Sequence, residues 1–130
     1  MALVQRFLKG LDKIRVEKGM SIVLISHVQI TRVIDPLFPE FDRWGLKLHK
    51  KTAALVREWL DILFFARHEQ FVQEKTGSFG KKTSTVIGTG NRILHSAPSP
   101  AYESKSRLSL PDPLPMEWAQ VQSAIDKARS

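Results

Sequence analysis

The spacing of hydrophobic residues changes several times along the chain, and each change predicts a different element. Residues 3–18 place apolar side chains at helical intervals with charged residues between them, which predicts an amphipathic helix. Gly19 follows, and glycine readily adopts the left-handed conformation that ends many helices. The next stretch, residues 21–26, is almost continuously apolar. It predicts a buried strand that ends beside His27.

The middle of the chain changes from an irregular to a helical pattern. Residues 28–45 have no sustained period and contain two prolines, which predicts a long loop of the kind that is usually functional or disordered. Residues 46–60 return to helical spacing, and residues 62–66 form a second apolar run that predicts a strand. The predicted helix has an inner stripe of Leu48, Thr52, Leu55, Val56 and Trp59, and its outward residues are Lys47, Lys50, Lys51 and Arg57.

After residue 66 the pattern becomes that of short strands separated by glycine-containing turns. Strand-like runs cover residues 70–75, 83–87 and 91–96, and hairpin turns are predicted at residues 76–80 and 88–90. Three prolines then predict an extended connector before a final helix that begins at Pro115. Its expected apolar stripe consists of Trp118, Val121, Ile125 and Ala128.

These elements predict an α/β fold, in which a partial mixed sheet with flanking helices is followed by a β-hairpin region. We expect one domain with a core at residues 1–67, a β-hairpin region at 68–110 and a C-terminal helix at 115–130. The first helix leads into a strand, but no strand precedes it to complete a βαβ unit. The predicted domain is therefore a truncated one.

Composition narrows the classes of function. The 130 residues include no cysteine, which excludes disulfides and thiolate metal sites and suits a reducing cytosol. No apolar stretch approaches the roughly 20 residues that a membrane helix needs, and the amino terminus lacks the pattern of a signal peptide. The formal net charge of +7 favours a polyanionic partner.

Three patterns that often mark a functional site do not predict one in this sequence. Residues 77–83 resemble a phosphate-binding loop, but the glycine spacing is wrong and the run lies between two strands, so a hairpin tip is the better interpretation. The four histidines lack the spacing of metal ligands, so we expect no metal site. Asp35, Glu40 and Asp42 fit paired carboxylates, although keeping the loop soluble explains them better.

His27 and the basic residues around the predicted loop are the candidates for a site. His27 lies where ligands meet strand ends, so a phosphate or water sensor and a histidine that merely caps the strand are equal alternatives. Lysines at a helix start oppose the helix dipole, which points to a role other than stability. Phosphate binding and a solvated helix face are again even alternatives. The nucleic-acid candidates are Arg32, Arg43, Trp44, Lys47, Lys50 and Lys51, because aromatic residues among basic ones suit single strands.

Several of these stretches resemble the carboxyl-terminal half of phage-encoded RecA-like ATPases of the AAA type, which act in recombination and single-strand annealing. The resemblance covers nearly the whole chain. Its most specific parts are Lys47 to Lys51 with Glu58-Trp59, and Lys105 to Pro111.

The resemblance implies a RecA-like arrangement of the sheet and roles for individual residues. His27 corresponds to the polar residue that senses the γ-phosphate. Residues 28–45 correspond to the mobile DNA-binding loop. Lys105 and Arg107 correspond to the basic pair that reaches the nucleotide of a neighbouring subunit, where such cations stabilise charge on the transferred phosphoryl group.

The family's phosphate loop and its magnesium-holding acidic strand have no counterpart in the sequence. We therefore expect this chain not to hydrolyse ATP by itself, and to meet ATP and magnesium only if another chain completes the site. The expected partners are single-stranded DNA and either further copies of the chain or a complementary ATPase subunit, in the cytoplasm of a bacterial host and not at a membrane. The alternative is a non-enzymatic phage module, derived from such an ATPase, that binds a protein or nucleic acid.

Overall fold

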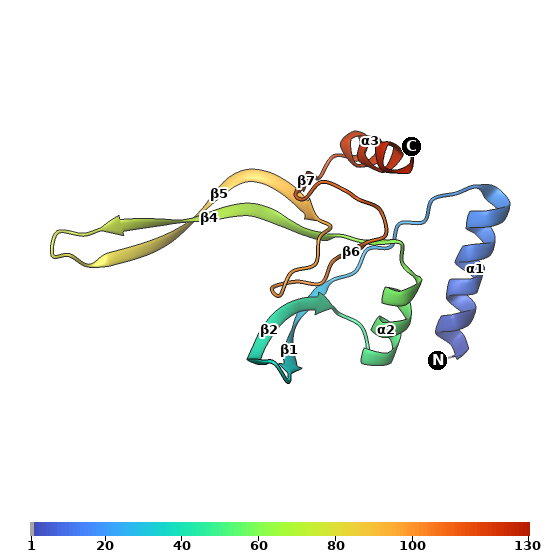
Figure 1. Ribbon diagram of the computed structural model, residues 1–130, viewed down its shortest axis with the longest axis horizontal. Coiled ribbons are helices and arrows are strands. Elements are labelled where there is room, and N and C mark those ends of the chain that lie inside the picture. Colours follow the sequence, from blue (N-terminus) through green and yellow to red (C-terminus); the bar gives the residue numbers. More distant parts are fainter. Residues whose placement is uncertain (1) are drawn as a thin grey trace. The chain divides into compact units, whose positions relative to one another are not determined.

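A computed structural model describes residues 2–130 (Figure 1). The contacts between residues divide the chain into two units. The first unit takes the chain up to Leu63 together with Pro98–Glu103, and the second takes Phe64–Ala97 together with Ser104–Ser130. Helices and strands are both present, which confirms the α/β class. The β1–β2 and β4–β5–β7 sheets are small and antiparallel, so the predicted mixed sheet is wrong for these strands.

The first unit begins with helix α1, Ala2–Lys18, as predicted. Gly19 ends it with a positive φ of 61°, which is the left-handed conformation expected of a terminating glycine. The strand predicted at residues 21–26 is wrong, because this segment has no regular secondary structure. A strand needs a neighbour to receive its backbone hydrogen bonds. Instead of being buried, Val23 is 70% exposed and Ile25 is 96% exposed.

The loop predicted at residues 28–45 is also wrong, because these residues form an antiparallel hairpin. Strand β1 covers Val28–Asp35 and strand β2 covers Phe38–Leu46. Asp35 stabilises the turn between them, since its Oδ1 accepts a hydrogen bond from the Leu37 N–H at 2.8 Å. Residues 98–103 lie beside β2, where Trp44 N–H donates to Ala101 O and Glu103 N–H donates to Trp44 O, both at 2.9 Å.

Helix α2 covers Lys50–Trp59, which is shorter than the predicted 46–60. It starts late because β2 continues to Leu46 and because His49 is the N-terminal cap, whose carbonyl accepts from the Ala53 N–H at 2.8 Å. Ala53 is buried, and α2 packs against α1. The short strand β3, Ile62–Leu63, ends this part of the unit.

The second unit is built on a long antiparallel hairpin. Strand β4 covers Phe65–Thr76 and strand β5 covers Lys82–His95. The turn between them confirms the hairpin predicted at residues 76–80. The turn predicted at residues 88–90 is wrong, because these residues belong to β5. Gly90, with a positive φ of 82°, lies where the strand register shifts opposite Glu69, so glycine here serves a β-bulge rather than a turn.

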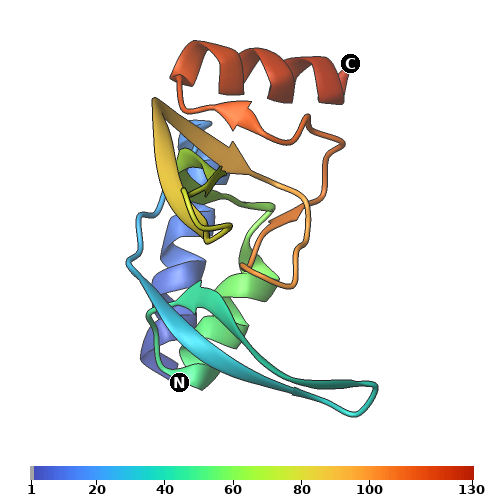
Figure 2. The same cartoon turned by 90° about the vertical axis from the view of Figure 1, so that its left-hand side faces the viewer.

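The core of the second unit lies at the base of this hairpin. Strand β6 covers Lys105–Ser106, and strand β7, Leu114–Pro115, pairs with β5 at Ile93 and Leu94. Helix α3, Trp118–Arg129, lies over β7 (Figure 2). Trp118 is 61% exposed, so its predicted place in the inner stripe is wrong. The core consists of Leu94, Leu114 and Val121, with Phe64, Leu110, Ala124 and Ile125 packed against it.

Candidate functional site

The β1–β2 hairpin separates two residues that the sequence places together. Arg43 faces residues 98–103, where its Nη2 donates to Tyr102 O at 2.7 Å and to Ser99 O at 3.2 Å. Trp44 is the next residue along the strand, so its side chain points to the opposite face, across from Ile30. Trp44 is 41% exposed and Ile30 is 60% exposed. Arg43 therefore fastens the hairpin, and Trp44 lies on an open face.

Arg32 lies on the same outward face as Trp44, but its charge is compensated. Its Nη1 donates to Asp42 Oδ1 at 3.2 Å and its Nε donates to Glu40 Oε2 at 3.3 Å. The hydrogen bond that Arg32 donates to Asp42, followed by the one that it donates to Glu40, raises the pKa of Arg32 further above its already high range. Glu40 and Asp42, for which keeping a loop soluble was the better explanation, thus neutralise Arg32 on this face.

Lys47, Lys50 and Lys51 present a different electrostatic situation. All three side chains are exposed, and none of them forms an ion pair within residues 2–130. Lys50 and Lys51 stand in the first turn of α2, which contains no acidic residue. A helix N-terminus carries unpaired N–H groups and partial positive charge, so the lysines and the helix end together favour an anion. We call these three residues the lysine cluster.

Glu103 connects helix α2 to the end of strand β2, and the sequence analysis did not identify it as a site residue. Its Oε1 accepts from Arg57 Nη2 at 2.7 Å, and its Oε2 accepts from the Leu46 N–H at 3.2 Å. The Glu103 side chain is only 19% exposed. Arg57, which the helical pattern placed outward, is therefore part of a partly buried contact. Gly45 leaves room for it, since a Cβ there would lie 3.4 Å from Glu103 Cδ.

His27 and the pair Lys105 and Arg107 fall in different units. His27 is exposed at the end of the irregular segment, and its carbonyl accepts from the Lys47 N–H at 3.0 Å and from Ser26 Oγ at 2.9 Å. Lys105 lies in β6 and is partly buried, while Arg107 is exposed just after it. The structure gives each of them a place, but the phosphate-sensing and subunit-bridging roles stay predictions.

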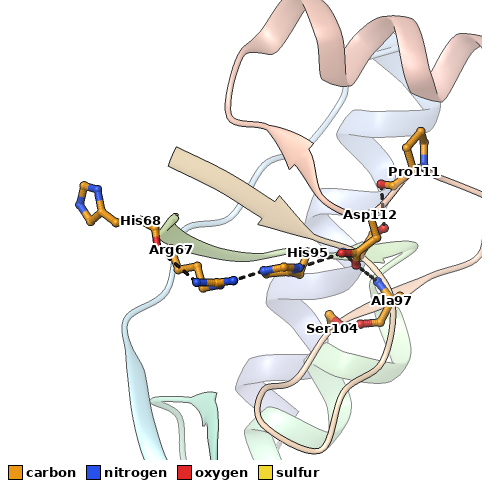
Figure 3. Close-up of polar contacts among 8 residues, drawn as sticks. Arg67, His68, His95, Ala97, Ser104, Pro111 and Asp112 are labelled. Carbon is orange, nitrogen blue, oxygen red and sulfur yellow. Dashed lines mark hydrogen bonds and ion pairs between the residues drawn. The ribbon is translucent and has the colours of Figure 1, made fainter. Parts of the chain in front are cut away.

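A polar network that the sequence did not reveal closes the base of the long hairpin (Figure 3). Arg67 Nε donates to His95 Nε2 at 2.9 Å, and His95 Nδ1 lies 2.8 Å from Asp112 Oδ1. Because Nε2 accepts from Arg67, His95 carries its proton on Nδ1 and donates it to Asp112. Asp112 Oδ2 also accepts from Ser96 N–H at 2.8 Å and Ala97 N–H at 2.7 Å.

The chemistry of this network is structural rather than catalytic. His95 is 7% exposed and both of its ring nitrogens are engaged, so it has no free lone pair with which to accept a substrate proton. Burial pushes the pKa of Asp112 up, but hydrogen bonds from the Ala97 N–H, from His95 and from the Ser96 N–H outweigh it and hold that pKa below its ordinary range. Asp112 therefore stays ionised as an acceptor. An Asp-Pro pair after a histidine-ended strand was the signal available in the sequence.

One comparison with known proteins covers most of the chain. Residues 1–108 match the model of the AAA domain family. The chain belongs to the AAA domain family. No curated protein and no solved structure matches it.

The described part of this AAA domain does not by itself fit ATP with magnesium. The glycines that imitate a phosphate loop, Gly77 and Gly80, form the hairpin turn, where Gly77 N–H donates to Lys81 O at 2.7 Å. The resemblance of residues 77–83 to a phosphate-binding loop therefore has no support in the structure. Within residues 2–130, no three histidine or acidic side chains gather where they could hold a metal ion. Over the same residues no helix is long and apolar enough to cross a membrane.

Proposed function

We propose that this AAA domain binds single-stranded DNA through the lysine cluster and acts in DNA recombination or single-strand annealing, without hydrolysing ATP by itself. The observation that carries the proposal is the group of three exposed lysines, Lys47, Lys50 and Lys51, that have no ion-pair partner within the described residues. Phosphate contacts by lysine supply most of the affinity for nucleic acid, because each contact releases condensed counterions.

The surrounding carboxylates leave this positive charge available. Glu40 and Asp42 are engaged by Arg32, and Glu103 is engaged by Arg57. Each of these three carboxylates therefore compensates an arginine and not a lysine. A phosphate at the start of α2 would meet lysine ammonium groups and unpaired helix N–H groups at once.

Trp44 adds a contact that lysines cannot make. It precedes the lysine cluster by three residues and its indole is 41% exposed on the outward face of the hairpin. An unpaired base stacks on an exposed aromatic ring, and this contact is tolerant of base identity. The proposed binding surface consists of Trp44 and the lysine cluster, with Arg32 and Arg43 holding the hairpin that presents it.

The proposal also limits the nucleotide chemistry. His27, Lys105 and Arg107 would contact phosphate groups only if a second polypeptide supplied the phosphate cradle and the metal. Such a polypeptide is a further copy of the chain or a complementary ATPase subunit. The purified chain is therefore expected to show no ATP hydrolysis, and turnover that His27→Ala abolishes would contradict this part.

Single-strand binding is tested by the double variant Lys50→Glu with Lys51→Glu. Fluorescence anisotropy with a labelled single strand should show weaker binding to all sequences, and the slope of log affinity against log salt should fall by about 1.4, or about 0.7 for each lost contact. Lys9→Glu with Lys13→Glu makes the same charge change on exposed residues of α1 and serves as the control.

Trp44→Ala separates stacking from charge. It should cost about 1–3 kcal/mol of single-strand affinity with little change in the salt slope. Binding that responds equally to the α2 and α1 charge reversals, together with a Trp44→Ala variant that changes only the melting temperature, would overturn the proposal.

A second candidate function is assembly with a protein partner, favoured by the exposed apolar residues of the first unit. The outward face of β1–β2 exposes Ile34 by 77%, Ile30 by 60% and Trp44 by 41%, with Arg32 between the two isoleucines. Exposed apolar patches of this kind mark interaction sites. Light scattering of the purified chain should then show a dimer or larger assembly that Ile30→Glu dissociates, and a concentration-independent monomer would exclude self-assembly.

A further inference from the structure

We propose that the distal part of the β4–β5 hairpin, residues 70–88, is a second nucleic-acid-binding element that enters the major groove of duplex DNA. We call these residues the arm. The inference rests on the shape and charge of the arm in the second unit. It does not depend on single-strand binding by the lysine cluster, which lies in the first unit.

The arm projects because strand β7 and helix α3, which lie at the base of the hairpin, do not extend along it. Strand β7 pairs with β5 only at Ile93 and Leu94, and the bulge opposite Glu69 interrupts the ladder just beyond this point. Within the second unit, the ribbon then continues away from β7 and α3 (Figure 1). Every residue of the arm is exposed except Ile87, which is partly buried.

The arm is a regular two-stranded ribbon of the size that the groove accepts. Its ladder runs through seven residue pairs, from Gln70 opposite Gly88 to Thr76 opposite Lys82. At about 3.3 Å per residue the ribbon is about 20 Å long. The major groove of B-form DNA is about 12 Å wide and admits such a ribbon.

One face of the ribbon has the chemistry of groove recognition. Residues opposite each other share a face, and faces alternate along a strand. Gln73 therefore lies beside Thr85 on the same face as Lys75 and Thr83, with Phe71 opposite Ile87 farther from the tip, and this face carries no carboxylate. Glutamine, threonine and lysine side chains are those that hydrogen-bond to base edges in the major groove. The single acidic residue, Glu74, lies opposite Ser84 on the other face, which also carries Thr76 opposite Lys82 near the tip.

Charge concentrates toward the tip of the arm. Lys75, Lys81 and Lys82 against Glu74 give residues 70–88 a net charge of +2 (3 − 1). None of these lysines forms an ion pair within the part of the chain that the structure describes. Phe79 stands at the apex and is 93% exposed, which places an apolar ring among cations. The arm thus offers phosphate contacts at its tip and polar contacts along one face.

The experiment measures binding of the whole chain to a duplex DNA, a duplex RNA and a single-stranded DNA of equal length. Lys81→Glu with Lys82→Glu should weaken duplex-DNA binding about tenfold or more at low salt and lower the salt slope by about 1.8, or about 0.9 for each lost contact. Gln73→Ala with Thr85→Ala should weaken duplex-DNA binding about fivefold. Thr76→Ala with Ser84→Ala changes the opposite face and should leave affinity within twofold.

Duplex RNA supplies the sharpest contrast, because its major groove is too deep and narrow for the ribbon. Duplex RNA that competes as well as duplex DNA would overturn the proposal. So would equal effects of the substitutions on the two faces, or an arm charge reversal that leaves duplex-DNA affinity within twofold. Lys50→Glu with Lys51→Glu should chiefly affect the single strand, so failure of the arm and failure of the lysine cluster give different patterns. Circular dichroism of each variant confirms that the fold is retained.

Discussion

The two hairpins of this AAA domain are fastened in a similar way and differ in what they leave exposed. Glu103 holds the end of β2 and α2, while Asp112 holds the end of β5. Along β1–β2, Arg32 is neutralised by Glu40 and Asp42. Along the arm, Lys75, Lys81 and Lys82 remain without ion-pair partners among the described residues. The compensated charge on β1–β2 is less available to a polyanion than the uncompensated charge of the arm.

Asp112 and Glu103, the carboxylates that anchor the two hairpins, differ in the number of hydrogen bonds that they accept. Asp112 accepts from two backbone N–H groups and from His95, whereas Glu103 accepts from one N–H group and from Arg57. Leaving buried donors without acceptors is what makes the loss of such a residue destabilising. The second hairpin should therefore be the more sensitive to removal of its anchor.

The largest expected effect is that of Asp112→Ala. It removes the acceptor of three hydrogen bonds at the base of the long hairpin and should lower the free energy of unfolding by about 2–3 kcal/mol. Chemical denaturation measures the change. Asp126→Ala, on α3, removes only a contact with Gln122 at the surface and should have little effect. Equal stabilities of the two variants would show that the network does not anchor the hairpin.

Glu103→Ala should have the next largest effect, about 1–2 kcal/mol of unfolding free energy. The Arg57 side chain is 40% exposed, so water can replace part of the lost ion pair. Glu103→Gln keeps a neutral acceptor for the Leu46 N–H and should recover part of the stability. A Glu103→Ala protein as stable as the unmodified chain would remove the parallel between the two anchors.

A double variant makes the first hairpin resemble the second in charge. Glu40→Gln with Asp42→Asn releases Arg32 and raises the net charge of the chain by two. Because cations that face solvent add phosphate contacts, single-strand affinity should rise several-fold and the salt slope should steepen. The surface ion pairs themselves add little stability, so the melting temperature should barely change. Unchanged affinity would place β1–β2 outside the binding surface.

The smallest expected effect is a dependence of stability on acid. The folded state holds the pKa of Asp112 below its ordinary range, so its contribution is fully present above the unfolded pKa of about 4. That contribution is lost as the pH falls from about 4 through the lower folded pKa. Unfolding free energies measured between pH 6 and pH 2 should fall less steeply in Asp112→Asn than in the unmodified chain. Identical slopes would argue against an ionised Asp112.

The sequence predicts the elements that depend on local interactions. Helix α1 and its end at Gly19 follow from periodicity and from the freedom of glycine to take a positive φ. The turn of the long hairpin follows from Gly77 and Gly80. Elements that depend on distant partners are predicted poorly. Residues 21–26 have the composition of a strand but no ladder, because pairing is a property of two segments.

The first hairpin shows that a short alternation of apolar and polar residues does not reveal which face of a strand is buried. Val28 and Ile30 alternate with Gln29 and Thr31, yet the apolar residues are the exposed ones. The inward face also carries Val33 opposite Phe41, and its polar residue Arg43 contacts residues 98–103, more than fifty residues later in the chain. The Asp35-Pro36 pair was the local signal for the turn. Among the candidate site residues, the sequence predicts exposed lysines but gives no sign that Arg43 and Arg57 bind backbone and carboxylate partners.

Because residues 98–103 belong to the first unit, the order in which the chain is synthesised affects when that unit can fold. They complete the first unit, with Tyr102 bridging to Trp44, although the whole long hairpin separates them from the rest of that unit in the sequence. A chain emerging from a ribosome presents α1, β1, β2 and α2 early, but Arg43 and Arg57 receive their partners only when Tyr102 and Glu103 have emerged. The first unit to begin translation therefore cannot finish folding until most of the second has been made.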